Sequence, residues 1–189
     1  MCQGPPAMSA PRIIKRTETR VSPWVRLVAK EVLVPPSATS QTYHSLAQAD
    51  YVSIVARLPD GRLPIVRQFR PAVDAETWEL PAGLLEPNER AEDAAGRELV
   101  EETGAVPLRV VDLGTFLPDT GRLENRIRIF GIEAAPPPAD FVAEPGMSVA
   151  LVTPAALAEM IRAGEFGHLL HVGALAVAEA RGFRTGVLS

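Results

Sequence analysis

The sequence predicts an α/β fold in which a mixed β-sheet carries helices on both sides. Two observations support this prediction. Segments rich in valine, isoleucine and threonine, which are typical of strands, fill much of the first 70 residues and return between residues 108 and 152. A charged segment with helical spacing follows Asn88, and two more helical segments follow Thr153. The chain shows no internal repeat, and no boundary divides it sharply.

The N-terminal part predicts antiparallel strands joined by turns. Residues 13–34, with a break at Pro23, predict two strands, and a proline pair with the polar run after it predicts a turn. Further strands are expected at 43–46, 51–58 and 63–69. The last two are joined by a Pro-Asp-Gly sequence that favours a tight turn, so we expect them in one antiparallel sheet.

A short helix is expected between residues 88 and 104. Asn88 can cap it, because its side chain can accept a hydrogen bond from a first-turn amide. Gly104 can end it in the left-handed conformation, and Pro107 prevents its continuation. Gly96 inside the helix indicates close packing on the sheet, since glycine otherwise weakens a helix.

The C-terminal part predicts three more strands and two helices. The strands are expected at 108–116, 126–133 and 149–152, and the helices at 154–163 and 169–181. Thr153 can cap the first helix, and Gly182 can end the second.

Composition excludes several classes of function. The net charge is -4 and no run of lysine and arginine occurs, which argues against a nucleic-acid partner. The single cysteine, Cys2, excludes an intramolecular disulfide framework and indicates a reducing compartment. Neither a signal peptide nor a membrane-spanning run is recognisable, so we expect a cytoplasmic protein without a membrane partner.

Three glutamates define the candidate site. Glu98, Glu101 and Glu102 have i, i+3 and i+4 spacing, which places their carboxylates on one helix face. Like charges at this spacing repel, whereas a divalent cation would be coordinated by them. The cluster therefore predicts a metal site, with a solvated acidic helix face as the alternative.

The same stretch resembles the Nudix box, the signature of hydrolases that cleave a nucleoside diphosphate linked to another group. The matching residues are Gly83, Glu89, Arg97, Glu98, Leu99, Glu101, Glu102 and Gly104, with Ala105 at the final apolar position. The resemblance implies a Nudix α/β/α sandwich with a mixed β-sheet, plus N-terminal antiparallel strands. It also implies Mg²⁺ as cofactor, with Mn²⁺ as a possible substitute.

Roles for the box residues follow from that resemblance. The metal ligands it implies are the backbone carbonyl of Ala82 and the carboxylates of Glu98, Glu101 and Glu102. Arg97 is expected to pair with a box glutamate and fix its rotamer, and Glu89 is a second support. Ordinary surface ion pairs are the alternative for all of these side chains.

The run RQFRPAVDAETWELPAG, residues 67–83, resembles the ADP-ribose and nucleotide-sugar pyrophosphatase branch of the family. In that branch an arginine at the position of Arg70 contacts the substrate diphosphate or ribose, and guanidinium can form a bidentate fork with phosphate oxygens. Glu79 in the same run and Arg126 in the loop that begins at Pro118 are also expected to bind substrate. For Arg70 and for this loop, solvent-exposed charge is the alternative.

The N-terminal runs SPWVRLV and QTYHSL resemble strands of the same branch in which aromatics from two subunits enclose the adenine. Trp24 and Tyr43 would be that pair in a homodimer, although a core or interface role for Trp24 is equally compatible with the sequence. His44 stands where many relatives have a base-contacting glutamate, which leaves the base open. We accordingly expect a disordered N-terminus at 1–11, dimerisation and base-contact strands at 12–47, and a Nudix hydrolase domain at 48–189.

Two further assignments are weaker. In the branch, a glutamate before the last short strand activates water, and here Glu144 and Asp140 are the candidates, with Glu144 preferred over a metal-activated water or a box glutamate as base. His168 and His171 have i, i+3 spacing that invites a zinc site, but solvent or packing roles are favoured because no cysteine or third histidine accompanies them.

The sequence thus predicts Mg²⁺-dependent hydrolysis of the pyrophosphate bond of ADP-ribose or a related nucleoside diphosphate sugar. The products would be a nucleoside monophosphate and a sugar phosphate. The alternatives are a UDP- or GDP-sugar diphosphatase and a non-catalytic, nucleotide-sensing Nudix module.

Overall fold

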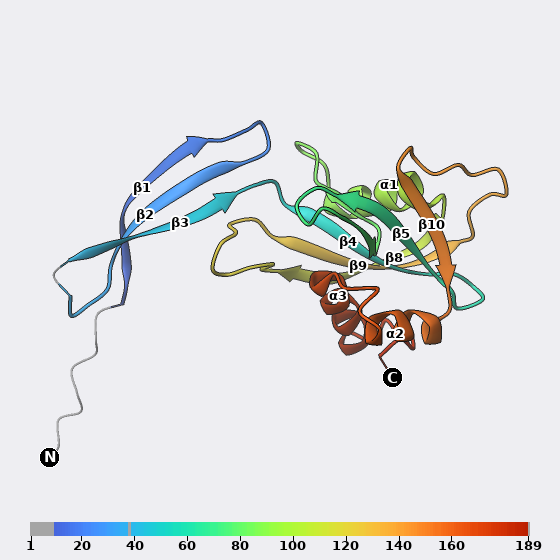
Figure 1. The fold of residues 1–189 in the computed structure, drawn as a ribbon. Helices are drawn as coiled ribbons and strands as arrows, with labels where there is room; N and C mark the ends of the chain where they lie inside the picture. Colours follow the sequence, from blue (N-terminus) through green and yellow to red (C-terminus); the bar gives the residue numbers. More distant parts are fainter. Residues whose placement is uncertain (1–9, 38, 189) are drawn as a thin grey trace, which may run out of the picture. The chain divides into compact units, whose positions relative to one another are not determined.

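The computed structural model describes residues 10–37 and 39–188, which form two compact units (Figure 1). The first unit contains the chain up to Ala49 together with Leu117–Asn125. The second contains Asp50–Phe116 and the chain from Arg126 onward. Most of the expected disordered N-terminus, including Cys2, lies outside the described residues.

The first unit is a three-stranded antiparallel sheet in the order β1-β2-β3. Its strands are β1 (Arg12–Arg20), β2 (Arg26–Leu33) and β3 (Ser40–Ala47), as the N-terminal pattern predicts. Every residue of β1 is exposed, and Val28 and Ala47 are the only buried apolar residues among the described residues of this unit. Apolar burial therefore contributes little to its stability.

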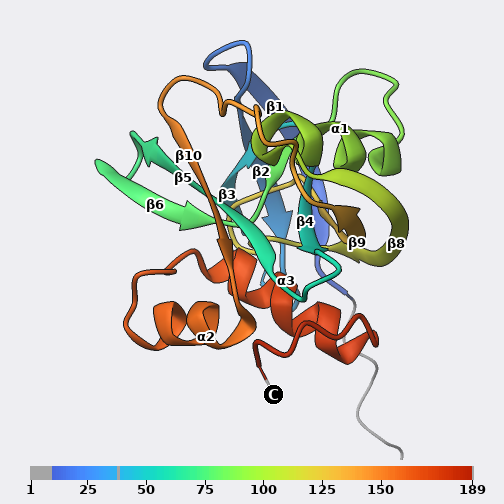
Figure 2. The ribbon, with the colours of Figure 1, turned by 90° about the vertical axis from the view of Figure 1, so that its right-hand side faces the viewer.

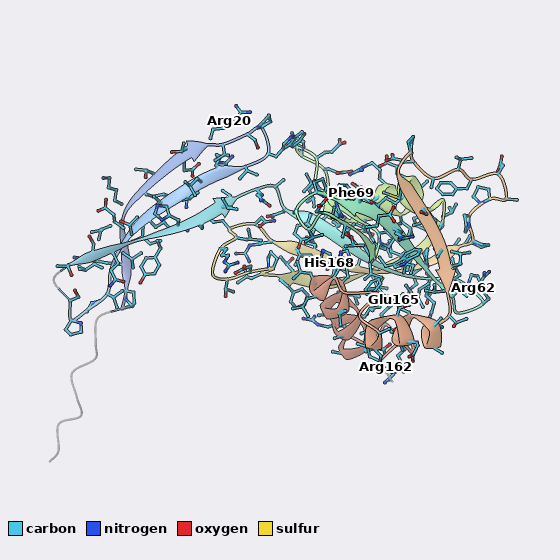
Figure 3. The ribbon with its side chains drawn as sticks, viewed as in Figure 1. Arg20, Arg62, Phe69, Arg162, Glu165 and His168 are labelled. Atoms are coloured by element: carbon cyan, nitrogen blue, oxygen red, sulfur yellow. The ribbon has the colours of Figure 1, made fainter. Side chains whose placement is uncertain are left out.

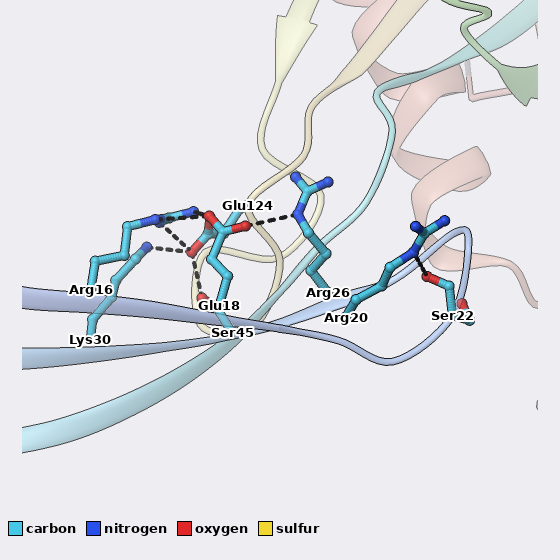
Figure 4. A network of polar contacts seen from close by, with 8 residues as sticks. All are labelled: Arg16, Glu18, Arg20, Ser22, Arg26, Lys30, Ser45 and Glu124. Atoms are coloured by element: carbon cyan, nitrogen blue, oxygen red, sulfur yellow. Dashed lines mark hydrogen bonds and ion pairs between the residues drawn. The ribbon is translucent and has the colours of Figure 1, made fainter.

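The segment Leu117–Asn125 is fastened to this sheet by backbone and side-chain contacts. The Leu46 amide donates to the carbonyl of Arg122 at 2.7 Å, and the Glu124 amide donates to the carbonyl of Leu46 at 3.0 Å. The Glu124 carboxylate accepts hydrogen bonds from Arg16 and Ser45 and forms an ion pair with Lys30 (Figure 4). Polar contacts thus supply much of the cohesion that the small apolar core does not.

The described residues of the second unit form seven strands and three helices. The strands form two sheets, in the orders β7-β4-β9-β8 and β10-β5-β6, and only the β4–β9 pair is parallel. The elements are β4 (Tyr51–Arg57), β5 (Leu63–Arg70), β6 (Ala75–Glu79), β7 (Ala82–Leu84), α1 (Ala91–Thr103), β8 (Val106–Phe116), β9 (Ile127–Ala135), β10 (Met147–Val152), α2 (Pro154–Arg162) and α3 (Leu169–Ala180).

The strands of this unit lie between α1 on one side and α2 with α3 on the other (Figure 2). Two apolar clusters fill the layers. One includes Leu99 of α1 with Ile54 and Phe130 of the sheet, and the other includes Leu157 and Leu175 of α2 and α3. The expected α/β/α arrangement with a mixed sheet is confirmed.

Several predicted boundaries and caps are also confirmed. Gly104 ends α1 with φ 69° and donates its amide to the carbonyl of Val100. The Thr153 hydroxyl accepts from the Ala156 amide at 3.2 Å at the start of α2. A Cβ on Gly96 would meet only Pro107 of β8, at 3.7 Å, which agrees with packing of α1 against that strand.

Two local predictions are wrong. Strands β4 and β5 were expected in one sheet but belong to different sheets. The turn between them, closed by the hydrogen bond from the Leu58 amide to the Arg62 carbonyl, connects the two sheets. Asn88 does not cap α1: it adopts φ 68°, and the N-cap is Arg90 without a side-chain hydrogen bond. The left-handed turn at Asn88 precedes Glu89, whose carboxylate accepts from the Glu86 amide at 3.0 Å.

Candidate active site

Arg97 organises the glutamates of the box. Its guanidinium makes a bidentate pair with Glu89, at 2.8 and 3.0 Å, and its Nη1 donates to Glu98 at 2.8 Å and to Glu101 at 3.0 Å. The hydrogen bonds from Arg97, followed by the one from the Glu86 amide, lower the pKa of Glu89 to about 2. Arg97 and Glu89 thus have the supporting contacts that the sequence led us to expect.

Gly83 lets the backbone of β7 approach α1. A Cβ at this position would lie 1.9 Å from the carboxylate carbon of Glu98, so the Glu98 carboxylate would have to move. The Glu98 side chain is 13% exposed, and burial raises its pKa against the opposing effect of Arg97. The first glycine of the box therefore leaves the space that the Glu98 carboxylate occupies in this structure.

Glu102 is the most enclosed carboxylate of the cluster. It is 8% exposed, and its Oε2 accepts from the Ala82 amide at 3.0 Å. Burial raises its pKa to about 8, and the nearby carboxylates of Glu98 and Glu79 add to that rise, while the Ala82 amide and Arg70 oppose it. The structure thus brings Ala82, Glu98 and Glu102 together at the junction of β7 and α1.

The donor set fits a hard divalent cation. Carboxylate and carbonyl oxygens are the ligands that Mg²⁺ takes, and the carboxylate of Glu102 forms no salt bridge with any described residue. In this structure the carboxylates of Glu98 and Glu101 accept hydrogen bonds from Arg97. In the described part of the chain, the one trio of acidic or histidine side chains whose ligand atoms all lie within 4.8 Å of one another is Glu79, His168 and His171.

Arg70 and the buried Glu79 form an ion pair beside this junction. Arg70 Nε and Nη2 donate to the two carboxylate oxygens of Glu79 at 2.8 and 2.6 Å, and the Thr77 hydroxyl donates at 2.6 Å. Burial would raise the pKa of Glu79, which is 1% exposed, but these hydrogen bonds outweigh burial and lower the pKa. Arg70 is 43% exposed, and its Nη1 hydrogens are not used by Glu79, so they can donate to a ligand.

The expected aromatic pair is exposed but not adjacent within the chain. Trp24 is 73% and Tyr43 is 50% exposed, which rules out a core position for Trp24 in this unit. Trp24 lies two residues before Arg26, which pairs with Ala47 at the end of β3, whereas Tyr43 lies four residues before Ala47. That separation is about 13 Å, too far for both rings to enclose one base.

Tyr43 borders a hollow of about 540 Å³ in the first unit. The hollow is also lined by Val32, Val34, Pro35, Pro36, Ser37, Thr39 and Gln41. The phenol hydroxyl of Tyr43 donates to Gln41 at 3.0 Å. An exposed ring beside such a hollow is available to a planar ligand, and no part of the structure tests this role.

The loop that carries Asp140 and Glu144 crosses the C-terminal end of α1. A Cβ on Gly104 would lie 2.5 Å from the ring of Phe141, so this ring rests on the glycine that ends the helix. Glu144 is exposed, and its carbonyl accepts from the Met147 amide at 2.9 Å. The loop therefore adjoins the helix end that carries Glu101 and Glu102, while the role of Glu144 stays a prediction.

Arg126 immediately precedes β9 and has an exposed side chain. Its amide donates to Asp50 Oδ1 at 2.7 Å, and its carbonyl accepts from the Tyr51 amide at 3.1 Å. The backbone is thus fixed, and the guanidinium has no polar partner among the described residues. Its contact with substrate remains a prediction.

Sequence analysis did not foresee what holds the segment before β7. The Leu80 amide donates to His171 Nδ1 at 3.0 Å, and the rings of His171 and His168 stack with centroids 3.9 Å apart. His168 lies at the N-terminal end of α3, as Figure 3 shows. The i, i+3 spacing of the two histidines was visible in the sequence, but their partner, 91 positions from His171, was not.

Comparison with known proteins decides the family. The NUDIX domain profile matches residues 47–164. The chain belongs to the Nudix family. The resemblance stated from the box is therefore confirmed. The matched range includes the glutamates of α1, the Ala82–Gly83 segment and Arg70.

The relatives include proteins named for pyrophosphate chemistry. An ADP-ribose pyrophosphatase of Bacillus subtilis is 33% identical over 42% of this chain and 43% of its own length. An ADP-sugar pyrophosphatase of Mus musculus is 34% identical over 43% of this chain and 42% of its own length. The aligned part thus spans less than half of each relative.

A solved structure shares the fold. The crystal structure of an ADP compounds hydrolase superposes with a TM-score of 0.76, covering 93% of this chain and 98% of its own, at 15% identity. Identity this low supports the fold alone. Separately, the described helices include none that is long and apolar enough to span a membrane.

Proposed function

We propose that this Nudix chain hydrolyses the pyrophosphate bond of ADP-ribose or a related nucleoside diphosphate sugar in a Mg²⁺-dependent reaction. The products are a nucleoside monophosphate and a sugar phosphate. The observation that carries the proposal is the closure of β7 on α1, where Gly83 admits the Glu98 carboxylate and the Ala82 amide meets Glu102. The relatives named ADP-ribose and ADP-sugar pyrophosphatases support the choice of substrate class.

Each residue of the site has a defined task in this proposal. Glu98, Glu101, Glu102 and the Ala82 carbonyl would hold the metal ion, which when bound neutralises the diphosphate and lowers the pKa of a water. Arg97 holds the side chains of Glu98 and Glu101 against repulsion.

Arg70 supplies the positive charge on the protein side. Glu79 fixes its guanidinium through Nε and Nη2, so the remaining N–H groups can bind phosphate or ribose oxygens. A bidentate arginine held by a buried carboxylate loses little side-chain entropy when the ligand arrives. Glu79 thereby contributes to substrate binding through Arg70.

Product release tests the proposal. Wild-type protein is incubated with ADP-ribose, ADP-glucose, UDP-glucose, GDP-mannose and NADH, each with Mg²⁺ and with Mn²⁺, and monophosphates are separated by chromatography. We expect AMP and ribose phosphate from ADP-ribose, and no product after chelation of the metal. Release from no substrate, combined with tight ADP-ribose binding, would instead support a nucleotide-sensing module.

The base specificity has one competing candidate. His44 on β3 is exposed and stands where a base-contacting glutamate is common in the branch, which favours a UDP- or GDP-sugar diphosphatase as the second candidate. Faster release of UMP or GMP than of AMP would select it.

Glu144 is proposed as the general base. Glu144→Gln removes the proton acceptor and should lower turnover about a hundredfold with little change in metal affinity. Asp140→Asn, in the same loop, is the matched control and should retain most activity. A near-normal rate for Glu144→Gln would exclude this residue as the base.

A homodimer is proposed through the N-terminal strands. Trp24 and Tyr43 of one chain are too far apart to enclose a base, but an aromatic from each of two copies could do so. Light scattering should give a dimer mass, and an active monomer would contradict the proposal. The cytoplasmic location remains a prediction from the sequence.

A further inference from the structure

The side chain of His171 reaches from α3 to the backbone just before β7. His171 is 2% exposed, and its Nδ1 accepts the hydrogen bond of the Leu80 amide at 3.0 Å. Leu80 is 1% exposed, so no water replaces this partner. Without His171 the Leu80 N–H would be a buried donor with no acceptor.

The hydrogen bond defines the chemical state of the ring. An Nδ1 that accepts carries no proton, so the neutral ring has its proton on Nε2. Burial, together with the charge of His168, lowers the pKa of His171 to about 3 despite the opposing effect of Glu79. The imidazole is therefore an uncharged acceptor at neutral pH.

This tautomer argues against a metal at the trio of Glu79, His168 and His171. Both nitrogens of His171 are committed, one as acceptor and one as N–H, and neither leaves a lone pair for a cation. Both oxygens of Glu79 are already bound by the guanidinium of Arg70. The closeness of these side chains needs another explanation.

The position of Leu80 in the chain supplies that explanation. On one side it adjoins Glu79, which holds Arg70, and two residues later comes Ala82, whose amide binds Glu102. Gly83 then passes so close to Glu98 that a Cβ would displace the Glu98 carboxylate. A segment packed this tightly transmits a displacement at Leu80 to the contacts at Ala82 and Gly83.

We propose that His171 is a positioning residue that fixes the segment 79–83, through the Leu80 amide, against the glutamates of α1. The consequence for catalysis rests on the proposed function, whereas the consequence for metal affinity does not require turnover. The stacked ring of His168 covers His171 and restrains its orientation.

Two substitutions at His171 separate the acceptor from the packing. His171→Asn places an amide oxygen near the position of Nδ1 and can keep the Leu80 hydrogen bond. His171→Leu has a similar volume but no acceptor. Leu175→Val, one turn farther along α3 and fully buried, changes apolar packing of the same helix without removing a hydrogen bond and serves as the control.

Mn²⁺ binding without substrate is measured by electron paramagnetic resonance, and exchange of the Leu80 amide by NMR. We expect His171→Leu to weaken Mn²⁺ binding at least tenfold and to speed exchange at Leu80. His171→Asn should stay within about threefold of wild type, and Leu175→Val should keep wild-type affinity. Wild-type affinity in His171→Leu, or equal losses in both His171 variants, would overturn the proposal.

A direct reading on the wild-type protein keeps the test valid if His171→Leu fails to fold. The ¹⁵N shifts of the His171 ring should show an unprotonated Nδ1 that accepts a hydrogen bond, and a protonated Nδ1 would overturn the proposal. If the wild type binds Mn²⁺ but hydrolyses no nucleoside diphosphate sugar, the proposed function fails, while the affinity loss in His171→Leu still supports the positioning role.

Discussion

Two glutamates in different units of the chain are placed in opposite electrostatic surroundings. Glu124, in the first unit, is contacted by Arg16, Lys30 and Ser45, and these hydrogen bonds, that from Arg16 foremost, lower its pKa to about 2. Glu102, in the second unit, has one hydrogen bond from a backbone amide, and burial raises its pKa to about 8.

The difference distinguishes a structural carboxylate from the one that we propose as a metal ligand. The contacts of Glu124 favour its charged form, so it stabilises the attachment of segment 117–125 to the first sheet. The surroundings of Glu102 disfavour its charged form, so folding alone gives no benefit from a glutamate there. A bound dication would reverse that balance, as the metal site that we propose requires.

The largest effect should follow from removing the charge of Glu102. Glu102→Gln keeps an acceptor for the Ala82 amide but removes an anionic ligand, and turnover should fall about 10²–10³-fold. Glu159→Gln, in α2 where the exposed Glu159 carboxylate pairs with Arg162, should leave turnover unchanged. Steady-state hydrolysis measures both rates. A wild-type rate in Glu102→Gln would contradict the proposed role of Glu102 in catalysis.

The next effect comes from closing the space beside Glu98. Gly83→Ala puts a methyl group where the Glu98 carboxylate lies, so the side chain must move and Mn²⁺ affinity should fall about tenfold or more. Gly173→Ala in α3 is the matched control, because its Cβ would meet nothing within 4 Å. That control should bind Mn²⁺ normally and gain up to about 1 kcal/mol of stability. Unchanged affinity in Gly83→Ala would show that the position of Glu98 is unimportant.

A smaller effect is the pH dependence of stability in the metal-free protein. The pKa of Glu102 is raised from 4.5 to about 8 on folding, so the folded state retains a proton that the unfolded state loses. The destabilisation of the folded state by buried Glu102 is absent below pH 4.5, grows as the pH rises and is complete above pH 8. Glu102→Gln should therefore match wild type near pH 4 and be more stable by about 2 kcal/mol at pH 8 in urea unfolding. Equal curves at both pH values would contradict the raised pKa.

The sequence predicted those features that depend on local pattern or on the spacing of the box. Gly104 as the end of α1 and Thr153 as the cap of α2 follow from the backbone preference and side-chain chemistry of single residues. The helical spacing of Glu98 and Glu102 likewise placed two box carboxylates on one helix face.

The failures concern one local backbone conformation and two contacts between distant segments. Asn88 has the chemistry of a cap, but its left-handed backbone removes it from the helix start. The turn after β4 looks like a hairpin, yet the two strands belong to different sheets because β4 pairs with β9 and β7. The partner of His171 lies 91 positions away, and no local pattern reports a tertiary hydrogen bond.

The smallest effect concerns the contribution of Glu124 to stability. The folded pKa of Glu124 is lowered from 4.5 to about 2, so its stabilising contribution is present above pH 4.5 and is lost as the pH falls to 2. Glu124→Gln should cost about 1 kcal/mol at pH 7, because the partly exposed partners Arg16 and Lys30 are screened by solvent. At pH 2 the difference from wild type should vanish.

Hydrogen exchange at the amides of Leu46 and Glu124 gives the local measurement, since both amides belong to the joint between segment 117–125 and β3. Faster exchange at pH 7 in Glu124→Gln, with unchanged exchange in α1, would show that this carboxylate serves attachment. Unchanged exchange at both amides would mean that the backbone hydrogen bonds alone hold the segment. The charge of Glu124 would then have no structural purpose in the first unit.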